Sequence, residues 1–136
     1  MAKSGTILAL LLPALSAICI AGALSAHAQQ PTIKRTDLVT ADQSETDSGY
    51  LWVADIAPGG ATGRHSHPTP RFVYVLEGSV VLEVDGKPAH TFMAGEGFAE
   101  APGEVHNFRN ASTTASAKAL GFQVAPKGTP LQTPAQ

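Results

Sequence analysis

Cysteine is nearly absent from this sequence of 136 residues, in which Cys19 is the only one and lies inside an apolar N-terminal stretch. Without that stretch the chain can form no disulfide and offers no thiolate nucleophile. No serine lies in the setting of a nucleophile elbow. These absences exclude a hydrolase that works through a covalent thiol or serine intermediate, and they require a fold that is stable without crosslinks.

Charged residues are also few. They make up 15% of the chain, with nine Lys and Arg against eleven Asp and Glu and a formal net charge of −2. The basic residues are scattered along the chain, whereas a nucleic-acid-binding protein gathers them on one face. Nucleic acid is therefore not an expected partner.

The first 28 residues have the features of a secretory signal. Lys3 is the only charged residue, residues 7–24 are apolar, and residues 26–28, Ala-His-Ala, give a small-x-small cleavage pattern. An uncleaved anchor is the alternative, because the apolar run approaches the ~20 residues that span a bilayer. The cleavage pattern favours removal, so we expect a periplasmic or secreted protein with no membrane contact after cleavage.

Short apolar segments separated by glycine- and proline-containing turns make up the rest of the chain. Asp85-Gly86 is a strong hairpin signal, and no stretch after the signal has convincing helical periodicity. Strands that recur at intervals of roughly 8–12 residues predict an all-β sandwich or barrel. The expected strands are residues 49–56, 72–76, 79–84, 87–93, 98–101, 105–109 and 118–124.

This pattern divides the chain into a barrel with an extension at each end. Residues 29–48 are polar with few apolar residues and predict an N-terminal arm with one short strand at most. Residues 49–124 contain the expected barrel. Residues 125–136 are rich in Pro and Thr and predict a loosely held C-terminal tail.

Two histidines, His65 and His67, stand at i and i+2 between a glycine-rich turn and an apolar segment. In an extended backbone alternate side chains share a face, with Cα atoms about 6–7 Å apart, so both imidazoles can approach one ion. His106 follows a Pro-Gly turn and is the third candidate. Three neutral imidazoles can hold a divalent ion and leave coordination positions open.

The spacing around the histidine pair resembles the first of two motifs of the cupins, small β-barrels of jelly-roll type. In that motif a glycine, five residues, His-x-His, three or four residues, a glutamate, six residues and a glycine follow one another. In this chain Gly59, His65, His67 and Gly78 fit the motif, and Arg71 stands at the position of the glutamate.

The second motif of the cupins has its counterpart further along the chain. Its spacing is reproduced by Gly95, Pro102, Gly103, His106 and Asn110, with an alanine in place of the first proline of the motif. The resemblance covers residues 49–124, and two motifs in the right order are far more specific than either alone. It implies an all-β fold, a small jelly-roll β-barrel.

Arg71 is the one departure from the first motif. In the family this position holds the glutamate that joins three histidines around a metal, and an arginine cannot ligate a cation. The resemblance therefore implies His65, His67 and His106 as the ligands of a divalent transition metal. Fe, Mn, Cu, Zn and Ni are all compatible with imidazole ligands.

Two interpretations are open for each of the charged residues near the motifs. Arg71 can bind a carboxylate of a small organic acid, or it can turn to the barrel rim and pair with Glu77 or Glu100, which is the commoner arrangement. Glu100 can replace the missing glutamate or act as a general base, although a solvent-exposed strand carboxylate is commoner. We name Arg71 and Glu100 as the candidate catalytic residues.

The resemblance implies two classes of function. The first is a metal-dependent oxygenase or isomerase that acts on a small organic acid. The second is a non-catalytic module that binds or senses a small molecule in the periplasm. A homodimer is expected in either case, because it is usual for the family and because edge strands need covering. The sequence does not decide between the two classes, since this barrel supports many chemistries.

Overall fold

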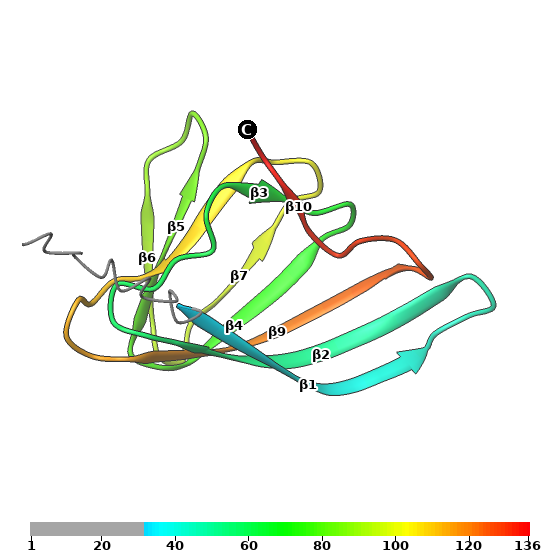
Figure 1. The fold of residues 1–136 in the computed structure, drawn as a ribbon, viewed down its shortest axis with the longest axis horizontal. Helices are drawn as coiled ribbons and strands as arrows, with labels where there is room; N and C mark the ends of the chain where they lie inside the picture. Colours follow the sequence, from blue (N-terminus) through cyan, green and yellow to red (C-terminus); the bar gives the residue numbers. More distant parts are fainter. Residues whose placement is uncertain (1–31) are drawn as a thin grey trace, which may run out of the picture.

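Ten β-strands in two antiparallel sheets form the described part of the chain, residues 32–136 of a computed structural model (Figure 1). The expected signal, residues 1–28, and the start of the expected arm lie outside the described residues. No helix within residues 32–136 is long and apolar enough to cross a membrane. The predicted all-β class is confirmed.

The two sheets have five strands each, and their orders are not sequential, as expected of a jelly roll. The first sheet has the order β1 (Ile33–Asp42), β2 (Asp47–Ile56), β9 (Ala117–Pro126), β4 (Arg71–Glu77) and β7 (Gly97–Glu100). The second has the order β10 (Thr133–Pro134), β3 (His65–Ser66), β8 (His106–Asn110), β5 (Ser79–Val84) and β6 (His90–Met93). The chain therefore passes repeatedly between the sheets, and residues far apart in sequence meet between them.

The core lies between the inner faces of the two sheets. Trp52 of β2 stands opposite Gly121 of β9, and a Cβ at position 121 would lie only 2.3 Å from the Trp52 ring. Glycine at this position therefore lets the indole lie directly against the neighbouring strand. The buried apolar cluster around it includes Ala54, Ile56, Val73, Val75, Val80, Phe108, Ala117 and Ala119.

The segment expected to be an arm holds a full strand. Rather than one short strand, β1 has ten residues, and it pairs with β2 from Ile33 opposite Ile56 to Asp42 opposite Ser48. Most of its residues are exposed, so its apolar pattern is weak. The tight turn at residues 43–46 and the hydrogen bonds to β2 define the strand, and a one-dimensional pattern shows neither.

The C-terminal segment is also more ordered than expected. β9 extends to Pro126, and β10 then pairs with β3, with Pro134 opposite His65 (Figure 1). We refer to residues 127–136 as the C-terminal strap. It runs past the histidine pair, where the sequence suggested only a loosely held tail.

The outer surface of the first sheet exposes several large apolar side chains. Phe72, Tyr74 and Phe122 are 54%, 46% and 41% exposed. Phe72 stands opposite Phe122, which in turn stands opposite Leu51, and Tyr74 stands opposite Leu120. These five residues form a continuous outer apolar face across β2, β9 and β4.

Candidate metal centre

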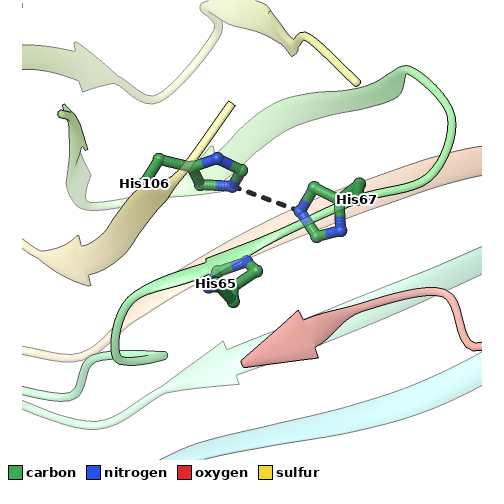
Figure 2. A group of neighbouring side chains, drawn as sticks. All are labelled: His65, His67 and His106. Carbon is green, nitrogen blue, oxygen red and sulfur yellow. Dashed lines mark hydrogen bonds between the residues drawn. The ribbon is translucent and has the colours of Figure 1, made fainter. Parts of the chain in front are cut away.

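The three predicted histidines meet at one point between the sheets (Figure 2). His65 of β3 stands directly opposite His106 of β8, and His67 follows β3 on the same side as His65. Each side chain is at most 2% exposed. The ring centroids lie 4.5–4.9 Å apart, so the i and i+2 spacing and the cross-strand register together produce the cluster.

Each imidazole is oriented by a hydrogen bond from Nδ1 to a backbone carbonyl. Because a carbonyl oxygen can only accept, Nδ1 must carry the proton, and Nε2 is left with its lone pair. This arrangement is typical of histidines that bind metals through Nε2. The acceptors for His65, His67 and His106 are the oxygens of Gly63, Leu131 and Glu104, at 2.8, 2.9 and 2.9 Å.

The three Nε2 atoms point toward one another. All three potential ligand atoms lie within 4.8 Å of one another, and Nε2 of His67 is 3.2 Å from Nε2 of His106. Two lone pairs at that distance repel unless a proton or a cation lies between them. Nε2 of His65 is buried and has no hydrogen-bond partner among the described residues. The cluster therefore fits a divalent metal ion.

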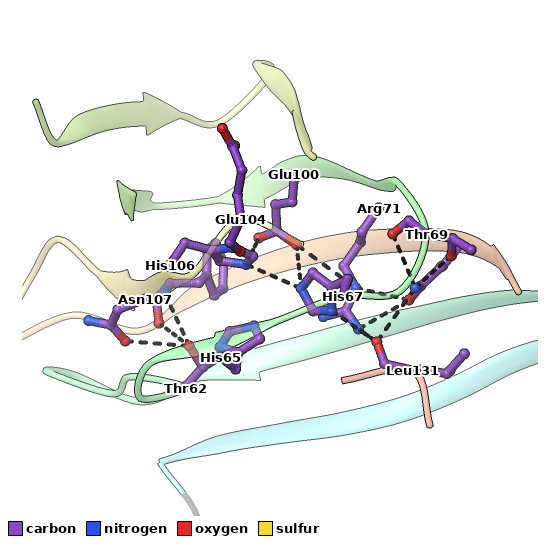
Figure 3. Close-up of polar contacts among 12 residues, drawn as sticks. Thr62, His65, His67, Thr69, Arg71, Glu100, Glu104, His106, Asn107 and Leu131 are labelled. Atoms are coloured by element: carbon purple, nitrogen blue, oxygen red, sulfur yellow. Dashed lines mark hydrogen bonds and ion pairs between the residues drawn. The ribbon is translucent and has the colours of Figure 1, made fainter. Parts of the chain in front are cut away.

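Glu100 joins this cluster from β7 (Figure 3). Its side chain is buried, with Oε2 3.0 Å from Nε2 of His67 and Oε1 3.4 Å from Nε2 of His106. Although the first distance is within hydrogen-bonding range, Oε2 has no hydrogen-bond partner within residues 32–136. The solvent-exposed arrangement considered commoner for Glu100 is thus wrong, because β7 turns this residue to the inner face.

Arg71 is buried beside Glu100 and does not turn to the rim. Its Nε and Nη2 each lie 3.2 Å from Oε1 of Gln123, and Nη2 also donates to the oxygen of Leu131 at 3.1 Å. Nε lies 3.9 Å from Oε2 of Glu100. The predicted alternative partner, Glu77, lies 3.5 Å from Lys118. The inward side chains of β4 and β9 explain the difference, since Arg71 and Gln123 stand directly opposite each other.

The protonation of the site follows from its burial and its charges. Burial lowers the pKa of His65 to about 4, so this imidazole is neutral at neutral pH. Burial by itself raises the pKa of Glu100, but contacts with His106 and His67 and the charge of Arg71 outweigh burial and lower this pKa to about 2, so Glu100 is a carboxylate that attracts positive charge to this point. Burial likewise lowers the pKa of His106, and the Glu100 carboxylate more than compensates, so the net pKa is raised. Burial lowers the pKa of Arg71 to about 10, which leaves it charged.

A cavity of about 320 Å³ opens next to the cluster. His65, Arg71 and Glu100 are among the polar residues that line it. Apolar walls are provided by Trp52, Val73 and Phe108, among others. The cavity thus combines one imidazole, one carboxylate and two guanidiniums, the second from Arg35, with an apolar wall.

Arg35 is a cavity residue that sequence reasoning missed. It comes from β1, and its guanidinium lies 3.9 Å from the centre of the Trp52 ring, while that of Arg71 lies 4.9 Å from it. Contacts of this kind between a guanidinium and an indole are favourable. Arg35 could not be predicted to lie here, because the arm was not expected to form a full strand beside β2.

The cupin domain family Cupin_2 matches residues 52–121. The chain belongs to this family. Among curated proteins, Protein SchB of Streptomyces halstedii is 34% identical over 74 residues, which cover 54% of this chain and 53% of SchB. The chain therefore matches only about half the length of that relative.

Solved structures support the same fold for this cupin. A cupin-like protein of Thermotoga maritima superposes with a TM-score of 0.60 and 22% identity, covering 71% of this chain and 77% of the other. An oxalate oxidase in complex with the substrate analogue glycolate superposes with a TM-score of 0.54 and 18% identity, covering 72% and 56%. At these identities the likeness shows the fold alone.

The C-terminal strap supplies a further feature that the motifs do not contain. The backbone oxygen of Leu131 accepts hydrogen bonds from Nδ1 of His67 and from Nη2 of Arg71 (Figure 3). One carbonyl thus orients a candidate ligand and the guanidinium next to it. No side-chain pattern could have indicated this role, because the interacting group belongs to the backbone.

Deletion of residues 128–136 is expected to weaken Zn²⁺ binding by about 10- to 100-fold, the range found when the outer hydrogen-bond partner of a ligand is lost. Affinity is measured by competition with a chelating indicator, and circular dichroism checks that the β-sheet signal persists. Leu131→Ala keeps the carbonyl and is the matched control, with unchanged affinity expected. A deletion variant that binds Zn²⁺ as tightly as the full chain would contradict the role given to the strap.

Proposed function

We propose that this cupin is an exported protein that binds one divalent transition metal through His65, His67 and His106 and acts as an oxygenase or isomerase on a small organic acid. The observation that carries the proposal is that three Nε2 lone pairs converge beside a cavity that also contains Arg71. Export rests on the signal-like residues 1–28.

The metal part of the proposal is supported by the chemistry of the donor set. Three imidazoles with fixed outer protons present nitrogen donors that suit Fe, Mn, Cu, Zn and Ni. When bound, such an ion supplies a Lewis acid with positions left open for a substrate. The protein shields the three nitrogen donors from solvent, since all three side chains are buried.

We assign binding of the acid's carboxylate to Arg71. Its Nε and Nη2 are used by Gln123 and Leu131, whereas Nη1 makes no hydrogen bond with any described residue. A charged N–H group in a shielded cavity forms a strong, charge-assisted hydrogen bond to a carboxylate. The bonds to Gln123 and Leu131 hold the guanidinium in place, so it can orient the acid beside the imidazoles.

The cavity walls restrict the rest of the substrate. Trp52, Val73 and Phe108 present apolar surface that can cover the carbon skeleton of an acid and keep water away from it. The cavity volume of about 320 Å³ is the size of a site for a small molecule. The oxalate oxidase with bound glycolate, a small organic acid, is a neighbour by fold and is compatible with this class of ligand.

The alternative is a periplasmic module that binds or senses the acid without converting it. It is favoured by the second guanidinium, since Arg35 and Arg71 both line the cavity and both approach Trp52. Two guanidiniums in one cavity favour the binding of an anion, although Arg35 is also paired with Asp37 and Arg71 lies near Glu100. Conversion of the bound acid in the presence of metal and dioxygen distinguishes the enzyme from the module.

The mature protein, purified without a histidine tag, is expected to contain near one equivalent of a single transition metal by elemental analysis. His106→Ala removes one of the three converging donors and should lose that metal. His90→Ala is the matched control, because His90 is exposed on β6, away from the cluster. Wild-type protein that contains no metal and takes none up on reconstitution would contradict the metal site, and a metal-free ligand-binding barrel would then be the better account. The mass of the same sample tests cleavage after Ala28.

Arg71→Lys is expected to weaken binding of a small carboxylic acid such as glycolate by about 10- to 100-fold, since a hydrogen bond to a charged group contributes about 1.5–3 kcal/mol. Binding is followed by the fluorescence of Trp52, the only tryptophan of the chain, which lines the cavity. The corresponding amide should bind weakly to both proteins.

The control for this measurement is Arg109→Lys, an arginine that pairs with Glu83 on the second sheet. It should leave acid binding unchanged. If wild-type protein binds acid and amide equally, or if Arg71→Lys binds the acid as wild type does, Arg71 is not the acid-binding residue.

A second copy of the chain is the partner that we propose for the outer apolar face. The five residues of this face carry no charge and lie in register on three adjacent strands. Charged pairs, Lys118 with Asp55 and Glu77, lie together on the same sheet beyond this face. Exposed apolar patches of this kind on a folded chain mark interaction sites, and a homodimer is what the family resemblance implies.

Phe72→Lys is expected to convert a dimer into a monomer, because it places a charge in the centre of the outer apolar face. Sedimentation velocity at micromolar concentration measures the change. Met93→Lys, at an equally exposed position on β6 of the other sheet, should remain dimeric. A monomeric wild-type protein would exclude this use of the face.

A further inference from the structure

The carboxylate that the cupin motif places on β4 has a counterpart on the neighbouring strand. Arg71 occupies the motif position on β4, and Glu100 of β7 stands directly opposite it in the antiparallel register. Side chains of directly opposed residues start about 4.5–5.5 Å apart on the same face of a sheet. A carboxylate at position 100 can therefore reach the space that a glutamate at position 71 would occupy.

The separations between Glu100 and the imidazoles match those of ligands that share one ion. Two donors that are each about 2.1 Å from an ion lie roughly 3.0 Å apart at a right angle and roughly 3.4 Å apart at the tetrahedral angle. Glu100 Oε2 is 3.0 Å from Nε2 of His67, and Oε1 is 3.4 Å from Nε2 of His106. The two imidazole nitrogens are themselves 3.2 Å apart.

The lack of a hydrogen-bond partner for one oxygen of Glu100 supports the same conclusion. Oε2 is buried and has no hydrogen-bond partner among residues 32–136, and Nε2 of His65 is in the same condition. A buried carboxylate oxygen is costly unless it is paired. Arg71 does not meet this need, because its Nε lies 3.9 Å away and its Nε and Nη2 bond to Gln123 and Leu131.

We propose that Glu100 is the fourth ligand of the metal, supplied from β7 in place of the motif glutamate on β4. The inference rests on the metal site of the proposed function and extends it from three ligands to four. Glu100 then coordinates the ion and does not act as a general base. Arg71 remains free to bind the acid, so the exchange of the two residues keeps the anionic ligand and adds a cation to the cavity.

The competing explanation is an ion pair without metal, in which an imidazolium of the cluster shares its proton with Glu100. The two explanations differ in what happens when the carboxylate is made neutral at constant shape. Glu100→Gln removes one negative ligand from a metal site, whereas in a metal-free ion pair it changes stability and no metal property.

The experiment uses Co²⁺ as the probe, because its visible absorption bands depend on the atoms that coordinate it. In Glu100→Gln these bands should shift, and the affinity for Co²⁺ should fall by more than the roughly 10- to 100-fold that follows loss of an outer hydrogen-bond partner. Glu77→Gln is the matched control, since this carboxylate is exposed at the end of β4 and pairs with Lys118. It should leave both the bands and the affinity unchanged.

A second variant distinguishes the loss of a ligand from a folding defect, because a carboxylate at another position can restore only a lost ligand. Adding Arg71→Glu to Glu100→Gln returns a carboxylate from the opposite strand to the same point, and it should recover most of the affinity and the wild-type bands. Unchanged bands and affinity in Glu100→Gln, or no recovery in the double variant, would overturn the ligand role of Glu100 while leaving the three-histidine site intact. Wild-type protein that binds no Co²⁺ at all would overturn both proposals.

Discussion

The hydrogen bonds that hold each Nδ1 proton on a backbone carbonyl are the constraint on which the rest of the site depends. They leave three lone pairs buried at one point, an arrangement that repels itself unless positive charge is present. Glu100 brings a carboxylate to the same point, which increases the need for a cation there. The cavity beside it is lined by charged and polar groups.

The jelly-roll connections bring these groups together from both sheets. His65 and His106 meet through the pairing of β3 with β8 in the second sheet, and Arg71 meets Glu100 and Gln123 through the pairings of β4 in the first. The site therefore lies where the inner faces of the two sheets approach each other. Arg71 and Glu100 occupy opposed positions of β4 and β7, so their charges face the same region between the sheets.

The aromatic wall of the cavity depends on close packing between neighbouring strands. Trp52 can lie against β9 only because residue 121 is a glycine, and the indole then contacts the guanidiniums of Arg35 and Arg71. One side chain thus links the core, the first strand and the cavity. The C-terminal strap completes the enclosure from the other sheet, with Leu131 bonding to both His67 and Arg71.

The all-β class, the cupin resemblance and the three converging histidines could be predicted from the sequence, because strand periodicity and motif spacing are local properties. Three other features depend on the tertiary structure. The mostly exposed strand β1 forms because it pairs with β2. Arg71 and Glu100 are buried because of the register of β4 with its neighbours. Leu131 acts through its backbone carbonyl. Hydrogen-bond pairing across strands places these groups, and it joins positions that no sequence window contains together.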